Sequence, residues 1–106
     1  MSIPRQVRYQ LRQRADWYCE ICGLNRGTNA HHRKNRSQGG KDELSNLLLL
    51  CGSGTTGCHG YVTEHPAESY EKGWSVRSTA TPRDIPVWYR CRWIWLDDFG
   101  HLAEAA

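Results

Sequence analysis

The amino-acid sequence predicts a small α+β domain, with a helix near the N-terminus, short strands and a helix in the middle, and a β extension at the C-terminal end. Three observations predict this fold: apolar residues at helical spacing near the N-terminus, short apolar or aromatic runs between polar loops, and four cysteines in two local pairs. The chain has 106 residues, which fits one domain. A domain of this size builds a modest core and often needs a cross-link.

The N-terminal helix is predicted over about residues 4–16. Val7, Leu11 and Ala15 recur at spacings of four, and most positions between them are arginine or glutamine. Pro4 suits the first turn of a helix, where a backbone N–H has no intrahelical partner. After the helix, the sequence CEICGLNRG predicts a tight turn that carries two cysteines.

The middle of the chain predicts two short strands and a short helix. NAHHR forms the first strand, and the almost wholly apolar NLLLLC forms a second strand that is buried on both faces. The polar sequence KNRSQGGKDELS connects the two strands as a loop. CHGYVTEH predicts a helix that ends near His65, because a residue before proline, here Pro66, disfavours the helical conformation.

The C-terminal part has a different composition. AESYEKG predicts a helical turn that Gly73 ends. WSVRST, DIPVWYR and RWIWLDD are rich in strand-forming residues and predict two or three antiparallel strands. We therefore divide the single domain into residues 1–66, which hold the N-terminal helix and the cysteine pairs, and residues 67–106, which hold the helical turn and the β extension.

The charge of the chain is unevenly distributed. Residues 1–41 hold nine Lys/Arg and two Asp/Glu, a net charge of 9 − 2 = +7, whereas residues 42–106 hold five and nine, a net charge of 5 − 9 = −4. The basic part predicts a polyanionic partner, with a solvated basic face as the alternative. The longest apolar run, Leu47–Leu50, is too short to span a membrane. With no secretory pattern either, we expect a cytoplasmic protein.

The cysteines predict a structural zinc site. Cys19 and Cys22 form a CxxC pair, and Cys51 and Cys58 form a second pair around a glycine-rich loop. Structural Zn²⁺ is held by four ligands in a tetrahedron, and four thiolates close its coordination shell. The alternative is four buried or redox-active thiols. Cys91 stands apart and is expected to be a spare thiol in the C-terminal strands.

Two adjacent histidines, His31 and His32, lie within a basic segment. On a strand their rings point to opposite faces and can do different tasks. One neutral imidazole can take a proton from water near pH 7, and another can bind a divalent cation. The alternative for each histidine is a structural role.

The ordered set CEICG, HHRKNRSQGG, SNLLLLC and CHGYVTEH, over about residues 15–66, resembles the HNH endonucleases of the ββα-metal nuclease superfamily. It looks most like their small zinc-stabilised members encoded by bacteriophages, often next to packaging genes. The resemblance implies a ββα-metal core and metal-dependent nicking or cutting of DNA with limited sequence preference. It also implies terminase or packaging proteins as partners, and the host cytoplasm as the location of a phage-encoded protein.

The resemblance also assigns roles to residues. His32 is expected to be the general base, His31 and His59 to be ligands of a catalytic divalent metal, and Asn46 to hold the loop that positions His32. The expected metals are Mg²⁺, Mn²⁺, Ni²⁺, Co²⁺ and Zn²⁺. Backbone phosphates are expected to bind the N-terminal arginines and three residues of the basic segment, which are Arg33, Lys34 and Arg36.

One position departs from the family pattern. Thr63 stands where many members have a further histidine, and His65 should face another direction because it lies six residues after His59. The catalytic metal is then expected to have two protein ligands. This departure supports a second reading, a zinc module that binds nucleic acid without cutting it. A third reading, an assembly or interaction protein, depends on the tryptophans of the C-terminal part.

Overall fold

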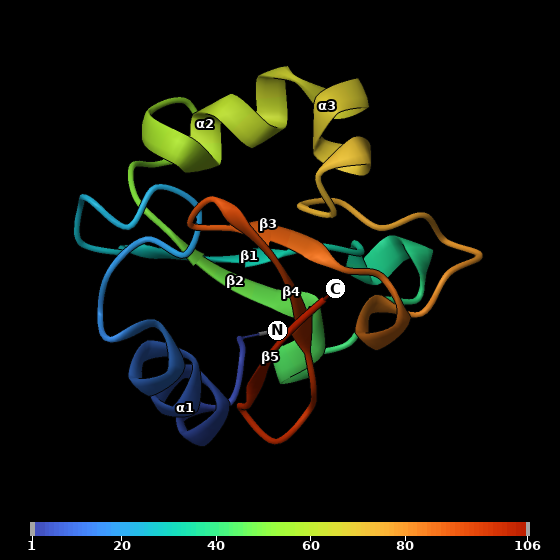
Figure 1. Cartoon of the computed structure of the whole chain (residues 1–106), viewed down its shortest axis with the longest axis horizontal. Coiled ribbons are helices and arrows are strands. Elements are labelled where there is room, and N and C mark those ends of the chain that lie inside the picture. Colours follow the sequence, from blue (N-terminus) through green and yellow to red (C-terminus); the bar gives the residue numbers. More distant parts are fainter. Residues whose placement is uncertain (1, 106) are drawn as a thin grey trace.

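The computed structural model describes residues 2–105, and it confirms the α+β class, with two antiparallel sheets and three α-helices in this part of the chain. Figure 1 shows helix α1 on one side of the β1–β2 hairpin and helices α2 and α3 on the other. The elements are α1 (Arg5–Ala15), β1 (Asn29–His32), β2 (Leu47–Leu50), α2 (Gly57–Glu64), α3 (Pro66–Glu71), β3 (Val87–Tyr89), β4 (Arg92–Leu96) and β5 (Leu102–Glu104), with short 3-10 helices η1 (Arg36–Gln38), η2 (Leu44–Asn46) and η3 (Pro82–Asp84).

Strand β2 separates two hydrophobic clusters, which confirms that it is buried on both faces. Leu47 and Leu49 belong to the cluster under α1, and Leu48 and Leu50 belong to the cluster shared with the C-terminal sheet. This division follows from the pleat, because successive side chains of a strand point to opposite faces. In the register of the hairpin, His32 is paired with Leu47 on the α1 side and His31 with Leu48 on the other.

Helix α1 has the bounds that its apolar spacing predicts, and a buried ion pair connects it to β2. Arg14 donates to both carboxylate oxygens of Glu20, at 2.8 and 2.9 Å, and the two side chains are 1 % and 0 % exposed. Arg14 also donates to the carbonyls of Leu44 and Leu47, and Glu20 accepts the amide N–H of Leu49. Because these further bonds satisfy both charged groups, their burial is tolerated.

The predicted helix ends are confirmed around Pro66. Helix α2 ends at Glu64, His65 caps it, and Pro66 begins α3. Gly73, which follows α3, has a φ of +73° and its ideal Cβ would lie 2.0 Å from the Pro86 carbonyl oxygen, so only glycine fits there. Within the described part of the chain, every helix is too short or too polar to cross a bilayer.

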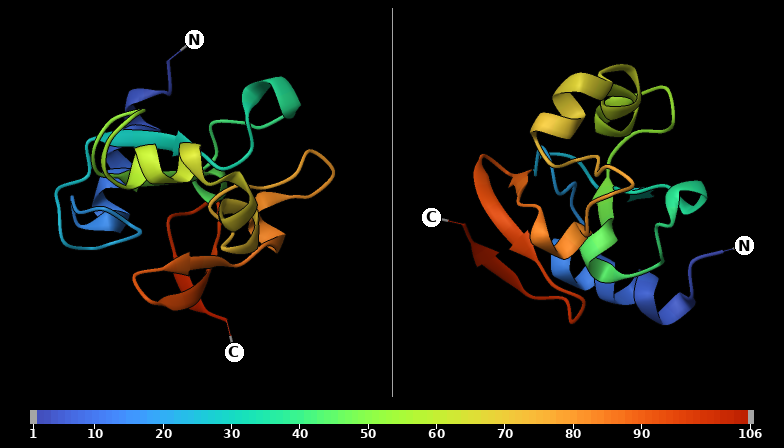
Figure 2. Two further views of the ribbon diagram at one scale, coloured as in Figure 1. Left: turned by 90° about the horizontal axis from the view of Figure 1, so that it is seen from above. Right: turned by 90° about the vertical axis from the view of Figure 1, so that its right-hand side faces the viewer.

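The C-terminal sheet confirms two of the three predicted strand segments. Strands β3, β4 and β5 form an antiparallel sheet in that order, and they lie on the flank away from η1 in both views of Figure 2. The prediction of a strand in WSVRST is wrong, because Trp74 and Val76 are buried in irregular backbone. The third strand is instead β5, whose sequence LAE has little strand preference.

The C-terminal sheet and the middle of the chain share one hydrophobic cluster. Its buried members from the middle are Cys19, Leu48, Leu50, Cys51 and Val62. Its buried members from the C-terminal part are Trp74, Val87, Tyr89, Ile94 and Leu96. The C-terminal extension therefore supplies half of the buried residues of the cluster that contains Cys19 and Cys51.

Candidate active site

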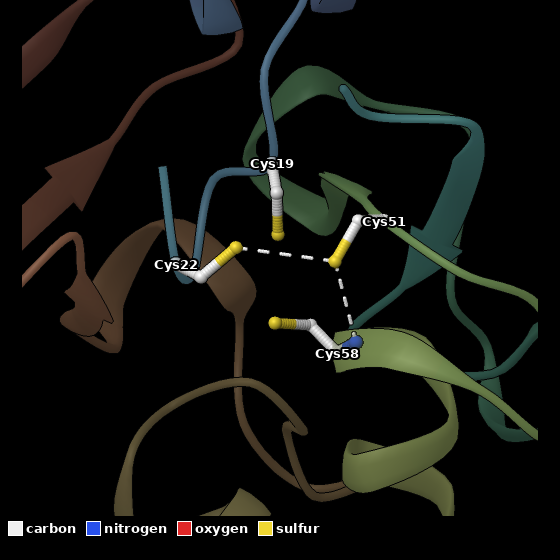
Figure 3. Close-up of side chains that lie close together, drawn as sticks. All are labelled: Cys19, Cys22, Cys51 and Cys58. Carbon is white, nitrogen blue, oxygen red and sulfur yellow. Dashed lines mark hydrogen bonds between the residues drawn. The ribbon is translucent and has the colours of Figure 1, made fainter. Parts of the chain in front are cut away.

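Four cysteine side chains from three separate segments meet at one point. Their sulfur atoms all lie within 4.8 Å of one another, and Cys22 Sγ lies 3.9 Å from Cys51 Sγ. Figure 3 shows the four thiols pointing toward a common centre. Four thiolates at about 2.3 Å from a tetrahedral Zn²⁺ lie about 3.8 Å apart, so the observed spacing fits this ion. We call Cys19, Cys22, Cys51 and Cys58 the four-cysteine cluster.

Local backbone geometry brings the second cysteine pair together. Gly52 has a φ of +85° and its ideal Cβ would lie 2.1 Å from the Thr56 carbonyl oxygen. Gly57 has a φ of +62° and stands 2.7 Å from Gly52 by the same measure. Both positions require glycine, and the closed loop places Cys58 at the start of α2, where its N–H donates to Cys51 Sγ.

Two of the clustered thiols have environments that affect their ionisation differently. Burial raises the pKa of Cys19. Burial also acts to raise the pKa of Cys22, but the amide N–H groups of Leu24 and Asn25, together with the side chains of Cys19 and Cys58, outweigh it and bring the pKa down to about 7. Since a thiolate is the metal ligand, Cys22 is prepared to give up its proton near neutral pH.

His31 and His59 face each other between β1 and α2. Their ring centroids are 5.6 Å apart, with the rings at 62°. His31 Nε2 donates to the Trp74 carbonyl oxygen at 2.8 Å, which leaves Nδ1 as the nitrogen without a proton in the neutral ring. The Nδ1 atom of His59 is buried and has no hydrogen-bond partner.

Both of these rings are held in the neutral form. Burial lowers the pKa of His31 to about 4, against the hydrogen bond to Trp74, and the positive charges of His59, His32 and Arg33 lower it further. Burial also lowers the pKa of His59. A neutral imidazole is the form that binds a metal, so the pair is ready for a cation at neutral pH.

His32 points to the opposite face of β1, as the strand prediction requires. Its Nε2 atom lies 2.8 Å from Asp42 Oδ1, and Arg36 also donates to this carboxylate, at 2.9 Å. The hydrogen bond from His32 is the main cause that lowers the pKa of Asp42. Nothing in the local sequence pattern distinguishes Asp42 from its polar neighbours in the loop, so only the fold identifies it as the partner of His32.

Asn46 closes the loop between the two strands. Its Oδ1 accepts the N–H of Lys34 at 2.8 Å, and its Nδ2 donates to the carbonyls of Lys34 and Lys41 at 3.0 and 2.9 Å. One buried amide therefore binds both ends of the loop that carries Asp42. This geometry accounts for an asparagine at this position, since a carboxylate could not donate to the two carbonyls.

The expectation that Arg33 contacts DNA is wrong. Its side chain is 2 % exposed and donates only to backbone carbonyls, those of Gly73, Ser45, Pro82 and Ile85. Its charge predicts a surface position, because arginine is rarely buried. The fold nevertheless supplies enough carbonyl acceptors to satisfy the guanidinium group in the interior. Of the other two expected contacts, Lys34 donates to the Ala80 carbonyl, and Arg36 is exposed beside Asp42.

The helix α2 offers a single histidine to the His31 side. Thr63 uses its hydroxyl to donate to the His59 carbonyl, and the His65 ring stacks on Tyr61 at 3.9 Å between centroids. Within residues 2–105, the four-cysteine cluster is the only grouping of three or more histidine, cysteine or acidic ligand atoms. His31 and His59 thus form a two-ligand arrangement.

The β1–β2 hairpin is followed by helix α2, and two histidines lie between them. Together with a four-cysteine cluster that fits a zinc ion, this arrangement is a ββα domain. Residues 19–60 match the family model of the HNH endonuclease. A match to an endonuclease family implies a nucleic-acid substrate. No curated protein and no solved structure matches the chain.

Proposed function

We propose that this protein is a metal-dependent DNA endonuclease that nicks or cuts phosphodiester bonds with limited sequence preference. The observation that carries the proposal is the pair of facing imidazoles, His31 from β1 and His59 from α2, inside the HNH match and next to the four-cysteine cluster. On the resemblance of its motifs, the biological setting that we propose is phage DNA packaging, with terminase or packaging proteins as partners.

The paired imidazoles fit a divalent cation. The buried Nδ1 of His59 lacks a partner, and a buried nitrogen without one is costly unless a ligand satisfies it. The His31 ring is held through its other nitrogen by a backbone carbonyl, which is the usual arrangement for a metal-binding histidine. A bound divalent cation would stabilise negative charge on the scissile phosphate. Mn²⁺, Co²⁺, Ni²⁺ and Zn²⁺ suit imidazole, and Mg²⁺ needs few protein ligands.

His32 is the proposed general base. Asp42 holds its Nε2 atom, so the ring is oriented and Nδ1 is the nitrogen that takes the proton from the attacking water. Strand β1 has β2 as its only partner in the sheet, among the described residues, and its other edge lacks a strand. A phosphate along this edge can be approached by His31 from one face of β1 and by His32 from the other.

Asn46 and Asp42 have positioning roles in this proposal. Asn46 fixes both ends of the connecting loop, the loop carries Asp42, and Asp42 orients His32. We expect Asp42→Asn to lower kcat by about 10–100-fold, the usual cost of removing a group that orients a functional histidine, with DNA affinity little changed. His101, which pairs with Asp97 on the surface at 3.1 Å, provides a matched control pair that should be silent.

A nucleic-acid-binding zinc module without catalysis is the second candidate. The observation that favours it is Thr63, whose hydroxyl is engaged with the backbone of α2 and leaves the metal only two imidazoles. Both candidates bind nucleic acid, so binding alone does not distinguish them. Cleavage does, because the module has no use for His32 as a base.

The decisive experiment is conversion of supercoiled plasmid to nicked or linear DNA, with zinc-loaded protein and each of the five metals in turn. The wild type and His101→Ala should cut, and His32→Ala should lose cleavage while keeping its circular dichroism spectrum and its DNA affinity. Cleavage by His32→Ala at the wild-type rate would exclude it as the base. A wild type that binds DNA but cuts with none of the metals would establish the non-catalytic module.

A further inference from the structure

A cleft of about 340 Å³ opens between α1 and β1, on the face of the hairpin opposite the His31–His59 pair. Three arginines line it, Arg8 and Arg12 from α1 and Arg36 from η1, and His32 also lines it. Apolar side chains, among them Ala30 and Leu49, complete its wall. We call it the α1 cleft.

The charge of the α1 cleft is strongly positive. None of its lining residues is acidic, and the carboxylate of Asp42 is paired with two of them, His32 and Arg36. Among residues 2–105, no carboxylate lies within ion-pair distance of Arg8 or Arg12. The partly buried residues Arg8 and Arg12 therefore give the cleft a positive charge that no carboxylate neutralises, which favours the binding of an anion there.

The spacing of the two helix arginines suits a chain of phosphates. Arg8 and Arg12 lie one helical turn apart, so their Cβ atoms are separated by about 5–6 Å on one face of α1. Guanidinium groups bind phosphate oxygens through two parallel hydrogen bonds. Because the cleft also reaches His32, an anionic chain seated in it leads to the proposed base.

We propose that the α1 cleft binds backbone phosphates of the DNA strand next to the bond that is cut, with Arg8 and Arg12 as the anchoring residues. This inference rests on the proposed nuclease function and specifies where its substrate lies. Arg33 is buried and is therefore not a phosphate contact in this proposal. The two proposed contacts, Arg8 and Arg12, lie outside the cysteine–histidine motif. Arg8 and Arg12 contact phosphate only, so they contribute affinity and register and not sequence preference.

The test is the salt dependence of binding to a fluorescein-labelled DNA duplex. It is measured by anisotropy with the zinc-loaded 106-residue protein and no added catalytic metal. Each lost phosphate contact reduces the slope of log K against log salt by about 0.9 between about 50 and 200 mM. Arg8→Gln and Arg12→Gln should each show this reduction. Arg5→Gln removes the same charge from an exposed position of α1 outside the cleft, and its slope should equal that of the wild type.

Two further measurements make the result decisive. Arg12 also lies over the Trp17 ring, at 5.4 Å from its centroid, so Arg12→Lys keeps the charge and should retain the slope even where the glutamine variant is less stable. In cleavage kinetics, Arg8→Gln should raise KM with kcat retained, because uniform binding is lost.

Unchanged slopes in both glutamine variants would overturn the α1 cleft as the DNA site, and so would an equal loss in Arg5→Gln. Wild-type KM after loss of Arg8 and Arg12 together would overturn it as well and leave the nuclease function standing. If the protein binds DNA through the α1 cleft but cuts with none of the metals, the cleft is confirmed as the DNA site and the proposed nuclease function is wrong.

Discussion

Replacing Arg33 by methionine tests whether a buried, charged side chain stabilises this fold through its hydrogen bonds. The guanidinium donates four hydrogen bonds to backbone carbonyls, at 2.7, 2.8, 2.8 and 3.1 Å. Bonds from a charged donor contribute about 1.5–3 kcal/mol each, so four supply about 6–12 kcal/mol. They connect the residue after β1 with the segments before β2, after α3 and before β3.

The opposing effect is the cost of burying the charge. Burial lowers the pKa of Arg33 from 12.5 to about 9. At about 1.4 kcal/mol for each pKa unit, this corresponds to about 5 kcal/mol that methionine would recover. The hydrogen bonds outweigh this cost across most of the range, and we expect Arg33→Met to lower the free energy of unfolding by about 4 kcal/mol.

The assay is urea unfolding followed by tryptophan fluorescence, with zinc held at one concentration. For a domain of this size, a loss of about 4 kcal/mol moves the midpoint down by about 2–3 M urea. The matched control is Lys34→Met, whose ammonium donates to a single carbonyl and should cost about 1.5 kcal/mol, well below the loss at Arg33. An Arg33→Met protein with the wild-type midpoint and weakened DNA binding would refute this reasoning. It would indicate that Arg33 is a surface residue that contacts DNA.

Three further results are expected. Removing zinc with a strong chelator should unfold the domain, because metal binding of about 10 kcal/mol or more is comparable with its whole stability; an unchanged melting temperature in zinc-free protein, verified by mass spectrometry, would disprove the cross-link. Thr63→His should raise catalytic-metal affinity in calorimetric titration, since positions 59 and 63 share a face of α2. His65→Ala should cut at nearly the wild-type rate because its ring stacks on Tyr61; inactivity would make His65 a ligand.

The parts of the fold that depend on local pattern were predicted from the sequence. The apolar spacing of α1, the apolar run of β2 and the proline after α2 each determine an element within a few residues. The four-cysteine cluster was predicted for a similar reason, because ligand number and tetrahedral geometry restrict how two cysteine pairs can be used.

The features that were missed depend on contacts between distant residues. Arg33 donates to carbonyls up to 52 positions away in the chain, and nothing in the sequence around Arg33 indicates these contacts. Trp74 is buried without forming a strand, since its indole N–H donates to the Trp88 carbonyl and its own carbonyl accepts from His31. Asp42 lies beside His32 in a loop whose two ends are held by Asn46, which is distant in sequence from Lys34.

The shared hydrophobic cluster limits how far the HNH-matching segment can be treated as an independent unit. The HNH match ends at residue 60, but the apolar side chains around Cys19 and Cys51 continue to Leu96. A graft of residues 19–60 onto another scaffold would carry the cysteines and histidines. It would leave Leu48 and Leu50 exposed to water, because the C-terminal side chains that cover them would be missing. A transfer of this segment to another protein must therefore include the C-terminal sheet, or provide other apolar side chains that pack on the same face of β2.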